Sequence, residues 1–288
     1  MLRTRLWMGA ILVALGVLVL VEGKWLAPWF PFLFVAGSLA AVLGAREFLL
    51  LLDPAIRPNN LLCLSGVFVV VATNWFAALH DTLPIDVWHA IGVVLVAALG
   101  AAFLTEMAHF QVPNNITQRI ALTVFVVAYV GILPSFLLQL RWLPGYVDGI
   151  PRSTMAIALA VFVPKVGDIG AYFTGKFLTG RLLGRTLMTP LLSPKKTWQG
   201  FAGGMIAAVL AAWGLNAIAP VIPGQVVGAI GFGLTVGLAG VLGDLAESLI
   251  KRDCQAKDAS RTIPGFGGVL DVIDSLLLAA PVAYLWLK

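Results

Sequence analysis

Three aspartates lie in or beside apolar segments near the C-terminal end of the chain, where charge is costly to place. Asp271 and Asp274 are three residues apart, so both carboxylates lie on one face of a helix that begins after Gly267 and Gly268. Asp244 lies near the end of the preceding apolar segment. Carboxylates so close repel each other unless a cation neutralises them, and oxygen ligands favour Mg²⁺, which joins one or two carboxylates to a phosphate group. The spacing therefore predicts a Mg²⁺ site formed by Asp244, Asp271 and Asp274.

A structural interpretation of the same aspartates is also open. The pair would then cap or flank the last helix, with Lys251 and Arg252 as ion-pair partners. Asp274 favours the cation site, because it lies a full turn inside the expected helix, where a side chain no longer caps the N-terminus.

The loop before this helix combines cations with glycine. Its basic residues are Lys251, Arg252, Lys257 and Arg261. Such cations bind phosphoryl oxygens and stabilise charge that develops during group transfer. Gly267 and Gly268 allow backbone N–H groups to turn toward an anion at the helix start. Positive-inside topology alone would explain the cations but not the glycines.

A second basic loop precedes the apolar run that begins near residue 200. Ser193, Lys195, Lys196 and Thr197 offer a compact phosphate-binding set there. Taken alone, a Pro-Lys-Lys turn is more often a solvated topology signal. We expect the two basic loops to act together on one ligand.

Charged residues also occur inside two other apolar runs. Asp168 follows Lys165 by three residues, and it is either half of an intramembrane ion pair or faces a cavity near Tyr172 and Lys176. Both interpretations are open. Arg46 and Glu47 are explained by Arg46 extending to the membrane interface with Glu47 paired nearby.

Composition places all these residues in a membrane protein. Of 288 residues, 60% are hydrophobic and only 11% are charged, and the mean hydropathy is +0.95, far outside the soluble range. A membrane span needs about 20 apolar residues. Nine runs of that kind occur, at 6–22, 29–52, 61–79, 87–105, 119–140, 154–175, 200–219, 226–250 and 268–287.

These runs predict an all-α, polytopic helical bundle of about nine transmembrane helices. We expect residues 1–288 to form a single membrane domain, with 1–150 as helical scaffold and 151–288 as the catalytic helices and loops. The glycines at 233, 237, 240 and 243 would let another helix approach closely.

The distribution of Lys and Arg predicts the orientation. An N-terminus on the cytoplasmic side places the basic 175–200 and 250–267 loops together on that side. The first run lacks a small-x-small cleavage site before Trp25, so we expect it to be a retained helix. Cys63 and Cys254 do not suggest a disulfide framework. The net charge of +5, concentrated in the two loops, suits a phosphate-rich ligand or an anionic lipid surface.

The C-terminal half resembles the phosphatidate cytidylyltransferases, also called CDP-diacylglycerol synthases. The family signature S-x-x-K-R-x4-K-D-x-[small]-x2-[apolar]-P-x-H-G-G-x-x-D-R-x-D is matched at Ser248, Lys251, Arg252, Lys257, Asp258, Ser260, Ile263, Pro264, Gly267, Gly268, Asp271 and Asp274. The segments DIGAYFTGKFLTGR and SPKKTWQG resemble further family motifs. Three positions depart from the pattern: Phe266 replaces the usual His, Val272 replaces an Arg, and Gln199 stands where Glu is common. Because the three acidic residues are retained, we expect an active enzyme.

The resemblance implies the reaction of CTP with phosphatidate to give CDP-diacylglycerol and pyrophosphate. It implies Mg²⁺, with room for a second cation, and an active site at the cytoplasmic face of the cell membrane. The expected catalytic residues are Asp244, Asp271, Asp274, Lys251 and Lys257. The expected substrate-binding residues are Ser193, Lys195, Lys196, Thr197, Arg252, Asp258, Arg261, Gly267, Gly268, Asp168 and Tyr172.

The expected partners are CTP, phosphatidate and membrane lipids, with no nucleic acid, and a homodimer is left open. The departures at Phe266 and Val272 leave open a CTP-dependent transferase or kinase that acts on another lipid, or a degenerate paralogue. An anion transporter is the alternative of another class, but charge gathered at one face, with no internal repeat, argues against transport.

Overall fold

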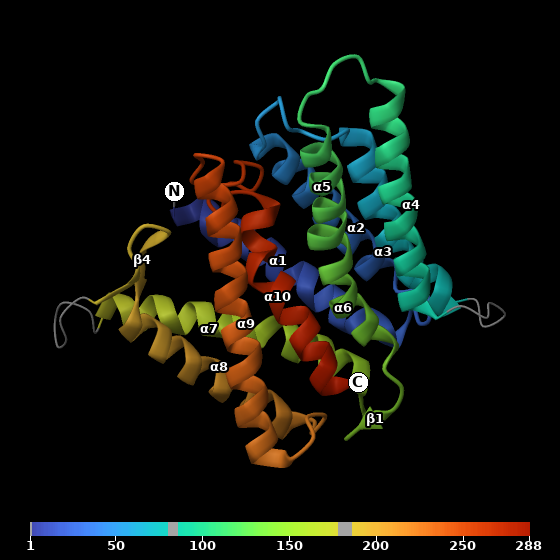
Figure 1. The fold of residues 1–288 in the computed structure, drawn as a ribbon. Coiled ribbons are helices and arrows are strands. Elements are labelled where there is room, and N and C mark those ends of the chain that lie inside the picture. The colour runs from blue at the N-terminus through green and yellow to red at the C-terminus, as the bar shows by residue number, and fades with distance from the viewer. Residues whose placement is uncertain (1, 80–85, 178–185) are drawn as a thin grey trace. The chain divides into compact units, whose positions relative to one another are not determined.

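The computed structural model describes residues 2–79, 86–177 and 186–288 and is almost entirely helical there (Figure 1). The helices are α1 (Leu2–Val21), α2 (Pro31–Leu51), α3 (Asn60–Leu79), α4 (Val87–Ala108), α5 (Ile116–Val126), the π-helical η2 (Val127–Ile132), α6 (Leu133–Gln139), α7 (Arg152–Phe177), α8 (Trp198–Ile218), α9 (Gln225–Asp253) and α10 (Val269–Leu287). Short 3-10 turns lie at η1 (Glu22–Lys24) and η3 (Leu140–Trp142).

The predicted all-α membrane class is confirmed. Each of the nine apolar runs coincides with a helix in the described residues, and α5, η2 and α6 together form the fifth. Eight helices there are long and apolar enough to cross a membrane, and Asn60–Phe76 is a shorter apolar helix. The chain is therefore an integral membrane protein.

The chain forms two compact units. One comprises the residues up to Leu138 together with Cys254–Ile273, and the other comprises Gln139–Asp253 together with Asp274–Lys288. We call them the first and the second unit. Helix α10 starts in the first unit and continues into the second. The single domain divided near residue 150 stays a prediction.

In the first unit, α2 packs on α3 and α3 packs on α4 and η2, and Figure 1 shows α4 and α5 side by side. Two buried polar side chains of this unit, Asn74 and Glu22, bond to other side chains or to backbone, because an unsatisfied polar group in an apolar interior is costly. Asn74 Nδ2 donates to Ser135 Oγ at 2.9 Å. The buried Glu22 accepts hydrogen bonds from the N–H groups of Phe32 (2.8 Å) and Leu33 (3.1 Å). Glu22 thereby satisfies the start of α2.

In the second unit, α7, α8 and α9 pack against one another, and α9 crosses α7 in Figure 1. The predicted role of the glycines on α9 is confirmed. A Cβ at Gly233 would lie 2.5 Å from the Val209 Cα, and one at Gly240 would lie 2.8 Å from the Pro164 Cβ. Neither contact leaves room for a side chain. A Cβ at Gly243 would lie 2.5 Å from the Asp274 carbonyl oxygen, so α9 and α10 touch through backbone at this point.

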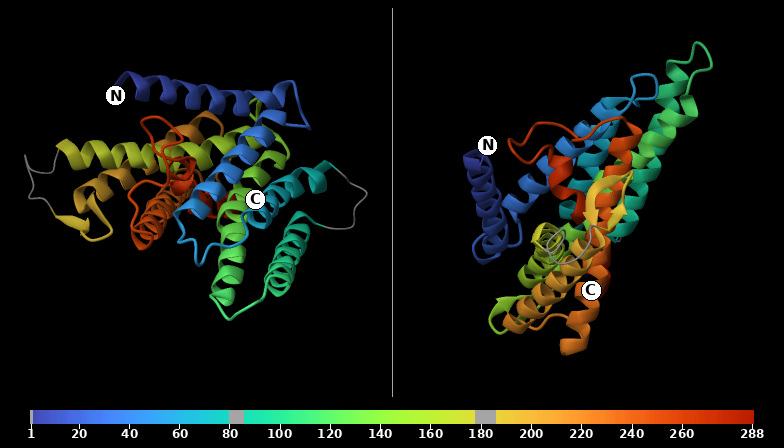
Figure 2. Two further views of the ribbon diagram at one scale, coloured as in Figure 1. Left: turned by 90° about the horizontal axis from the view of Figure 1, so that it is seen from above. Right: turned by 90° about the vertical axis from the view of Figure 1, so that its left-hand side faces the viewer.

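Two short antiparallel hairpins interrupt the helical pattern. Strands β1 (Tyr146–Val147) and β2 (Ile150–Pro151) precede α7, and β3 (Leu187–Thr189) and β4 (Ser193–Thr197) precede α8. The predicted Pro-Lys-Lys turn is wrong, because the SPKKT segment is strand β4 and pairs with β3 (Figure 2). Strand β4 leads directly into α8.

Replacement of Gly243 by alanine should separate α9 from α10. The added methyl group would meet the Asp274 carbonyl at 2.5 Å, and overpacking of this kind costs about 1–3 kcal/mol. We expect Gly243→Ala to lower the melting temperature of the detergent-solubilised protein. Gly214→Ala on α8 is the matched control, since a Cβ there meets nothing within 4 Å. Equal melting temperatures for the two variants would contradict the packing.

Candidate functional site

A lysine lies between two carboxylates in the second unit. Lys165 on α7 has its Nζ 3.8 Å from the Asp168 carboxylate and 3.6 Å from the Asp274 carboxylate of α10. The Asp274 side chain is only 13% exposed. The ion pair predicted for Lys165 and Asp168 is confirmed, and it extends to a second helix. One cation thereby offsets the charge of two carboxylates that would otherwise be costly in an apolar bundle.

A second lysine neutralises the carboxylate of α9. Lys196 Nζ on β4 lies 2.9 Å from Asp244 Oδ2, and Ser248 Oγ donates to Asp244 Oδ1 at 3.3 Å. Asp274 also interacts electrostatically with Asp244 and Asp168. Three carboxylates from three helices and two lysines from two elements are therefore gathered in one place. We call Lys165, Asp168, Lys196, Asp244 and Asp274 the charged cluster.

The glycines of α9 bring the cluster together. Gly240 faces Pro164, the residue before Lys165, and Gly243 faces the backbone of Asp274. Any larger residue at either position would push α7 or α10 away from α9. The small residues and the charges thus belong to one arrangement.

In the first unit, Asp271 orders the start of α10. Its Oδ2 accepts the Gly268 N–H at 2.6 Å and the Ala259 N–H at 3.0 Å. Gly267 has φ +103°, a left-handed conformation that favours glycine. One oxygen of Asp271 therefore has the capping role that the structural interpretation gives it, while Asp274 caps nothing and lies in the charged cluster.

Glu47 is the residue that our sequence interpretation missed. Arg46 is exposed, whereas its neighbour Glu47 on α2 is only 3% exposed. The Glu47 carboxylate accepts Ser260 Oγ–H at 2.6 Å and the Leu270 N–H at 2.9 Å. The predicted pairing of Glu47 with Arg46 is therefore wrong, because the Glu47 carboxylate bonds to Ser260 and Leu270 instead. A carboxylate in an apolar run was the available signal, and its partners are distant in sequence.

Three further residues of the predicted site form ion pairs or hydrogen bonds with other parts of the protein. Lys251 pairs with the buried Glu247, and Arg252 Nε donates to the Leu192 carbonyl at 3.2 Å. Thr197 is the N-cap of α8, since its hydroxyl accepts the Gly200 N–H at 3.1 Å.

The remaining predicted residues lie on the surface or in β4. Tyr172 is exposed, and its hydroxyl lies 3.5 Å from Lys176 Nζ. Ser193 lies at the start of β4. The exposed basic and acidic members of the predicted site are Lys195, Arg252, Lys257, Asp258 and Arg261. These exposed side chains are accessible to a ligand from solvent.

The cluster contains three carboxylates, and carboxylate oxygens are the kind of ligand that Mg²⁺ prefers. Among the described residues, no group of three or more His, Cys, Asp or Glu side chains is close enough to enclose a metal ion. Mg²⁺ does not require such a cage, because it keeps several waters and uses one or two carboxylates together with phosphate oxygens. Asp244 and Asp274 supply such carboxylates, and Asp271 lies one turn before Asp274 on α10.

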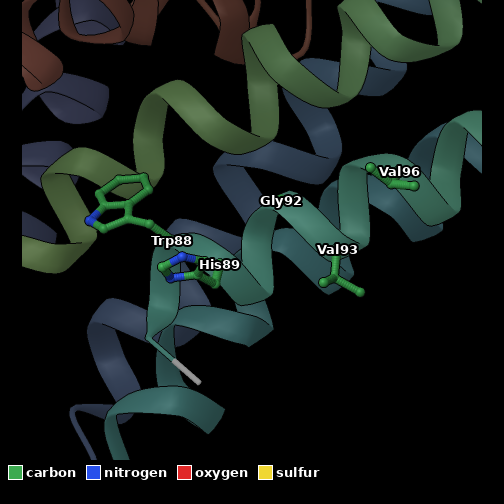
Figure 3. A pocket seen from close by; sticks show the side chains of 5 residues that line it. All are labelled: Trp88, His89, Gly92, Val93 and Val96. Atoms are coloured by element: carbon green, nitrogen blue, oxygen red, sulfur yellow. The ribbon is translucent and has the colours of Figure 1, made fainter. Parts of the chain in front are cut away.

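A hollow of about 550 Å³ lies elsewhere, along α4 (Figure 3). Its lining residues are Trp88, His89, Gly92, Val93 and Val96. The Trp88 ring packs on Phe136 with a centroid separation of 4.3 Å. The hollow is open and largely apolar, and it carries none of the predicted site residues.

Comparison with known proteins gives one consistent answer. The sequence model of the Cytidylyltransferase family matches residues 1–288. A phosphatidate cytidylyltransferase of Synechocystis sp. is 28% identical over 94% of this chain and 92% of its own length. The Bacillus subtilis phosphatidate cytidylyltransferase is 32% identical over 65% of each chain. The chloroplastic phosphatidate cytidylyltransferase 5 of Arabidopsis thaliana is 34% identical over 68% of this chain, which spans about half of that relative (52%).

The Lys165–Asp274 pair gives a test by non-additivity. Lys165→Met leaves Asp274 without its cation, which should cost about 1–3 kcal/mol, because an uncompensated charge remains in the bundle. Adding Asp274→Asn removes that charge, so we expect the double variant to melt at a higher temperature than Lys165→Met alone. Lys195→Met, at an exposed lysine of β4, should leave the melting temperature unchanged. Additive losses would show that the two side chains do not interact.

Proposed function

This chain belongs to the Cytidylyltransferase family, and we propose that it is a phosphatidate cytidylyltransferase, which transfers CMP from CTP to phosphatidate. The products are CDP-diacylglycerol and pyrophosphate. The names of its relatives support this substrate pair. The match of the family model to the whole chain supports it further.

The charged cluster is the observation that carries the proposal. Charged side chains inside a membrane protein cost about 3 kcal/mol or more each at the bilayer centre, so a protein keeps them where they serve a function. Here three carboxylates and two lysines are gathered from α7, β4, α9 and α10. A triphosphate and a lipid phosphate are the kinds of ligand that such a set binds.

The reaction needs positioning more than covalent chemistry by the protein. An oxygen of the phosphatidate phosphate attacks the α-phosphorus of CTP, a new P–O bond forms, and the bond between the α- and β-phosphates breaks as pyrophosphate leaves. Mg²⁺ held by Asp244, Asp271 and Asp274 would neutralise the triphosphate, and a second cation fits the same role. Lysines that orient the phosphates would hold the attacking oxygen, the α-phosphorus and the leaving pyrophosphate in line.

We assign the phosphate contacts to the basic side chains of the two loops. Lys196 would exchange Asp244 for a phosphate oxygen, and Ser193 and Thr197 lie on the same strand to orient it. The basic residues of the other loop are Lys251, Arg252, Lys257 and Arg261. Lys257 and Arg261 are exposed and available from solvent.

The basic loops also underlie a proposed orientation. Lys and Arg accumulate on the cytoplasmic side of membrane proteins, so both loops and the site would face the cytoplasm of a cell membrane. A lipid substrate from the inner leaflet and soluble CTP would then meet at one interface. A homodimer stays a prediction.

Purified protein should incorporate radiolabelled CTP into lipid when phosphatidate and Mg²⁺ are present, and EDTA should abolish the incorporation. Asp244→Asn and Asp274→Asn should each lower the rate by about 100-fold or more, because charge on the transferring phosphate would lose its stabilisation. Thin-layer separation of the labelled product measures both effects. Asp148→Asn, at an exposed left-handed turn position that asparagine tolerates, is the matched control.

Other outcomes would identify another function. Labelled product with a different lipid, and none with phosphatidate, would favour a transferase or kinase with another substrate. Anion flux into vesicles without turnover would favour transport. Full activity in Asp244→Asn and Asp274→Asn would refute the assignment of these carboxylates.

A further inference from the structure

A buried carboxylate that the proposed reaction does not use lies on α2. Glu47 is 3% exposed and belongs to a helix that is otherwise almost free of charge. Its Oε1 accepts the Ser260 hydroxyl at 2.6 Å and its Oε2 accepts the Leu270 N–H at 2.9 Å. Glu47 therefore joins α2 to two places in a segment more than two hundred residues later (213 and 223).

These two places are adjacent to the groups that hold Asp271. Ser260 follows Ala259, whose N–H donates to Asp271 Oδ2 at 3.0 Å. Leu270 precedes Asp271, and Gly268 donates the second hydrogen bond to Asp271 Oδ2 at 2.6 Å. Glu47 thus bonds to both backbone segments from which the Asp271 carboxylate takes its hydrogen bonds.

The packing at Gly268 shows how closely these groups fit. A Cβ at Gly268 would collide with the Glu47 carboxylate, and it would lie 3.0 Å from Ser260 Oγ. Ser260 Oγ lies 2.8 Å from Thr262 Oγ1 and accepts the Thr262 N–H at 3.0 Å, which extends the network along the loop. The segment 259–271 is therefore fixed to α2 at one buried acceptor.

We infer that Glu47 is a positioning residue, which sets the orientation of the Asp271 carboxylate through Ser260 and the N-terminal turn of α10. The buried negative charge of Glu47 is stabilised there by the N-terminus of α10, where unpaired N–H groups and the helix dipole favour an anion. The inference rests on the proposed function and deepens it, because Asp271 is one of the proposed Mg²⁺ ligands.

Glu22 of η1, which bonds to the start of α2, provides a matched control for a merely structural role. Glu22 is also a buried carboxylate of the first unit, 1% exposed, and it also accepts backbone N–H groups at a helix start, those of Phe32 (2.8 Å) and Leu33 (3.1 Å). Both of these hydrogen bonds are to the start of α2, not to the segment 259–271. Loss of Glu22 should therefore lower stability without altering the orientation of Asp271.

The test compares Glu47→Leu, Glu47→Gln and Glu22→Leu in the full-length protein. Glu47→Leu should lower kcat by about 10- to 100-fold, the usual effect of losing a group that orients a ligand residue, with little change in KM for CTP. Glu47→Gln should retain most of the activity, because its oxygen accepts the Leu270 N–H and its amide donates to Ser260 Oγ. Glu22→Leu should keep the kcat of the wild type.

Hydrogen exchange of the Mg²⁺-free protein gives a readout that does not depend on turnover. Glu47→Leu should speed exchange in the segment 256–272, and Glu22→Leu should not. The inference would be overturned if Glu47→Leu kept the wild-type kcat, or if Glu22→Leu lost as much kcat as Glu47→Leu. It would also be overturned if hydrogen exchange of the segment 256–272 were unchanged in Glu47→Leu. If Glu47→Leu does not fold, Ser260→Ala replaces it. We expect Ser260→Ala to show faster hydrogen exchange at Ala259 and a lower kcat. Wild-type values of both quantities would contradict the inference. Wild-type protein that makes no CDP-diacylglycerol would refute the proposed function instead, and the exchange comparison would still be decided.

Discussion

The structure depends on one constraint: a carboxylate inside an apolar helix needs a compensating group, and three carboxylates here find one on another element. Asp274 finds Lys165 of α7, Asp244 finds Lys196 of β4, and Glu47 finds Ser260 and the N-terminus of α10. None of these partners lies on the same helix as the carboxylate. Because desolvated charge is so costly without a partner, each pair also specifies which elements must lie together. In a bilayer, where helices gain little from burying apolar surface against one another, such polar contacts add specificity to close packing.

Close packing and charge pairing reinforce each other on α9. The absence of side chains at Gly240 and Gly243 lets Pro164 and the Asp274 backbone approach α9 directly. That approach is what brings Lys165 and Asp274 near the Asp244 carboxylate. A helix with larger residues at the two glycine positions would hold the same charges too far apart to compensate one another. The glycines therefore have an electrostatic consequence although they carry no charge.

The sequence was sufficient for the helices and for most of the cluster, but not for the partners of each charge. Apolar runs of about 20 residues predict spans because the backbone must satisfy its own hydrogen bonds in lipid, and every run here is a helix. The pair of Lys165 and Asp168 follows from a spacing of three. Strand β4 could not be predicted, because the Pro-Lys-Lys segment has little strand propensity and its pairing with β3 depends on tertiary context. Glu47 was misjudged because its partner Ser260 is 213 residues away, and local spacing carries no information about such a contact.

The lysines of the cluster also bear on how a phosphate ligand would be admitted. They serve as internal counterions of the three carboxylates. If Asp244 and Asp274 hold a divalent cation as proposed, that cation would take the place of the lysines as their counterion. Lys165 and Lys196 would then be available to the phosphate oxygens of the proposed substrate. In such an arrangement every charge would keep an opposite partner, and the cost of an uncompensated ion would be avoided. The charged cluster has three carboxylates and two lysines, so its lysines leave a net negative charge. That excess charge would favour the binding of a divalent cation.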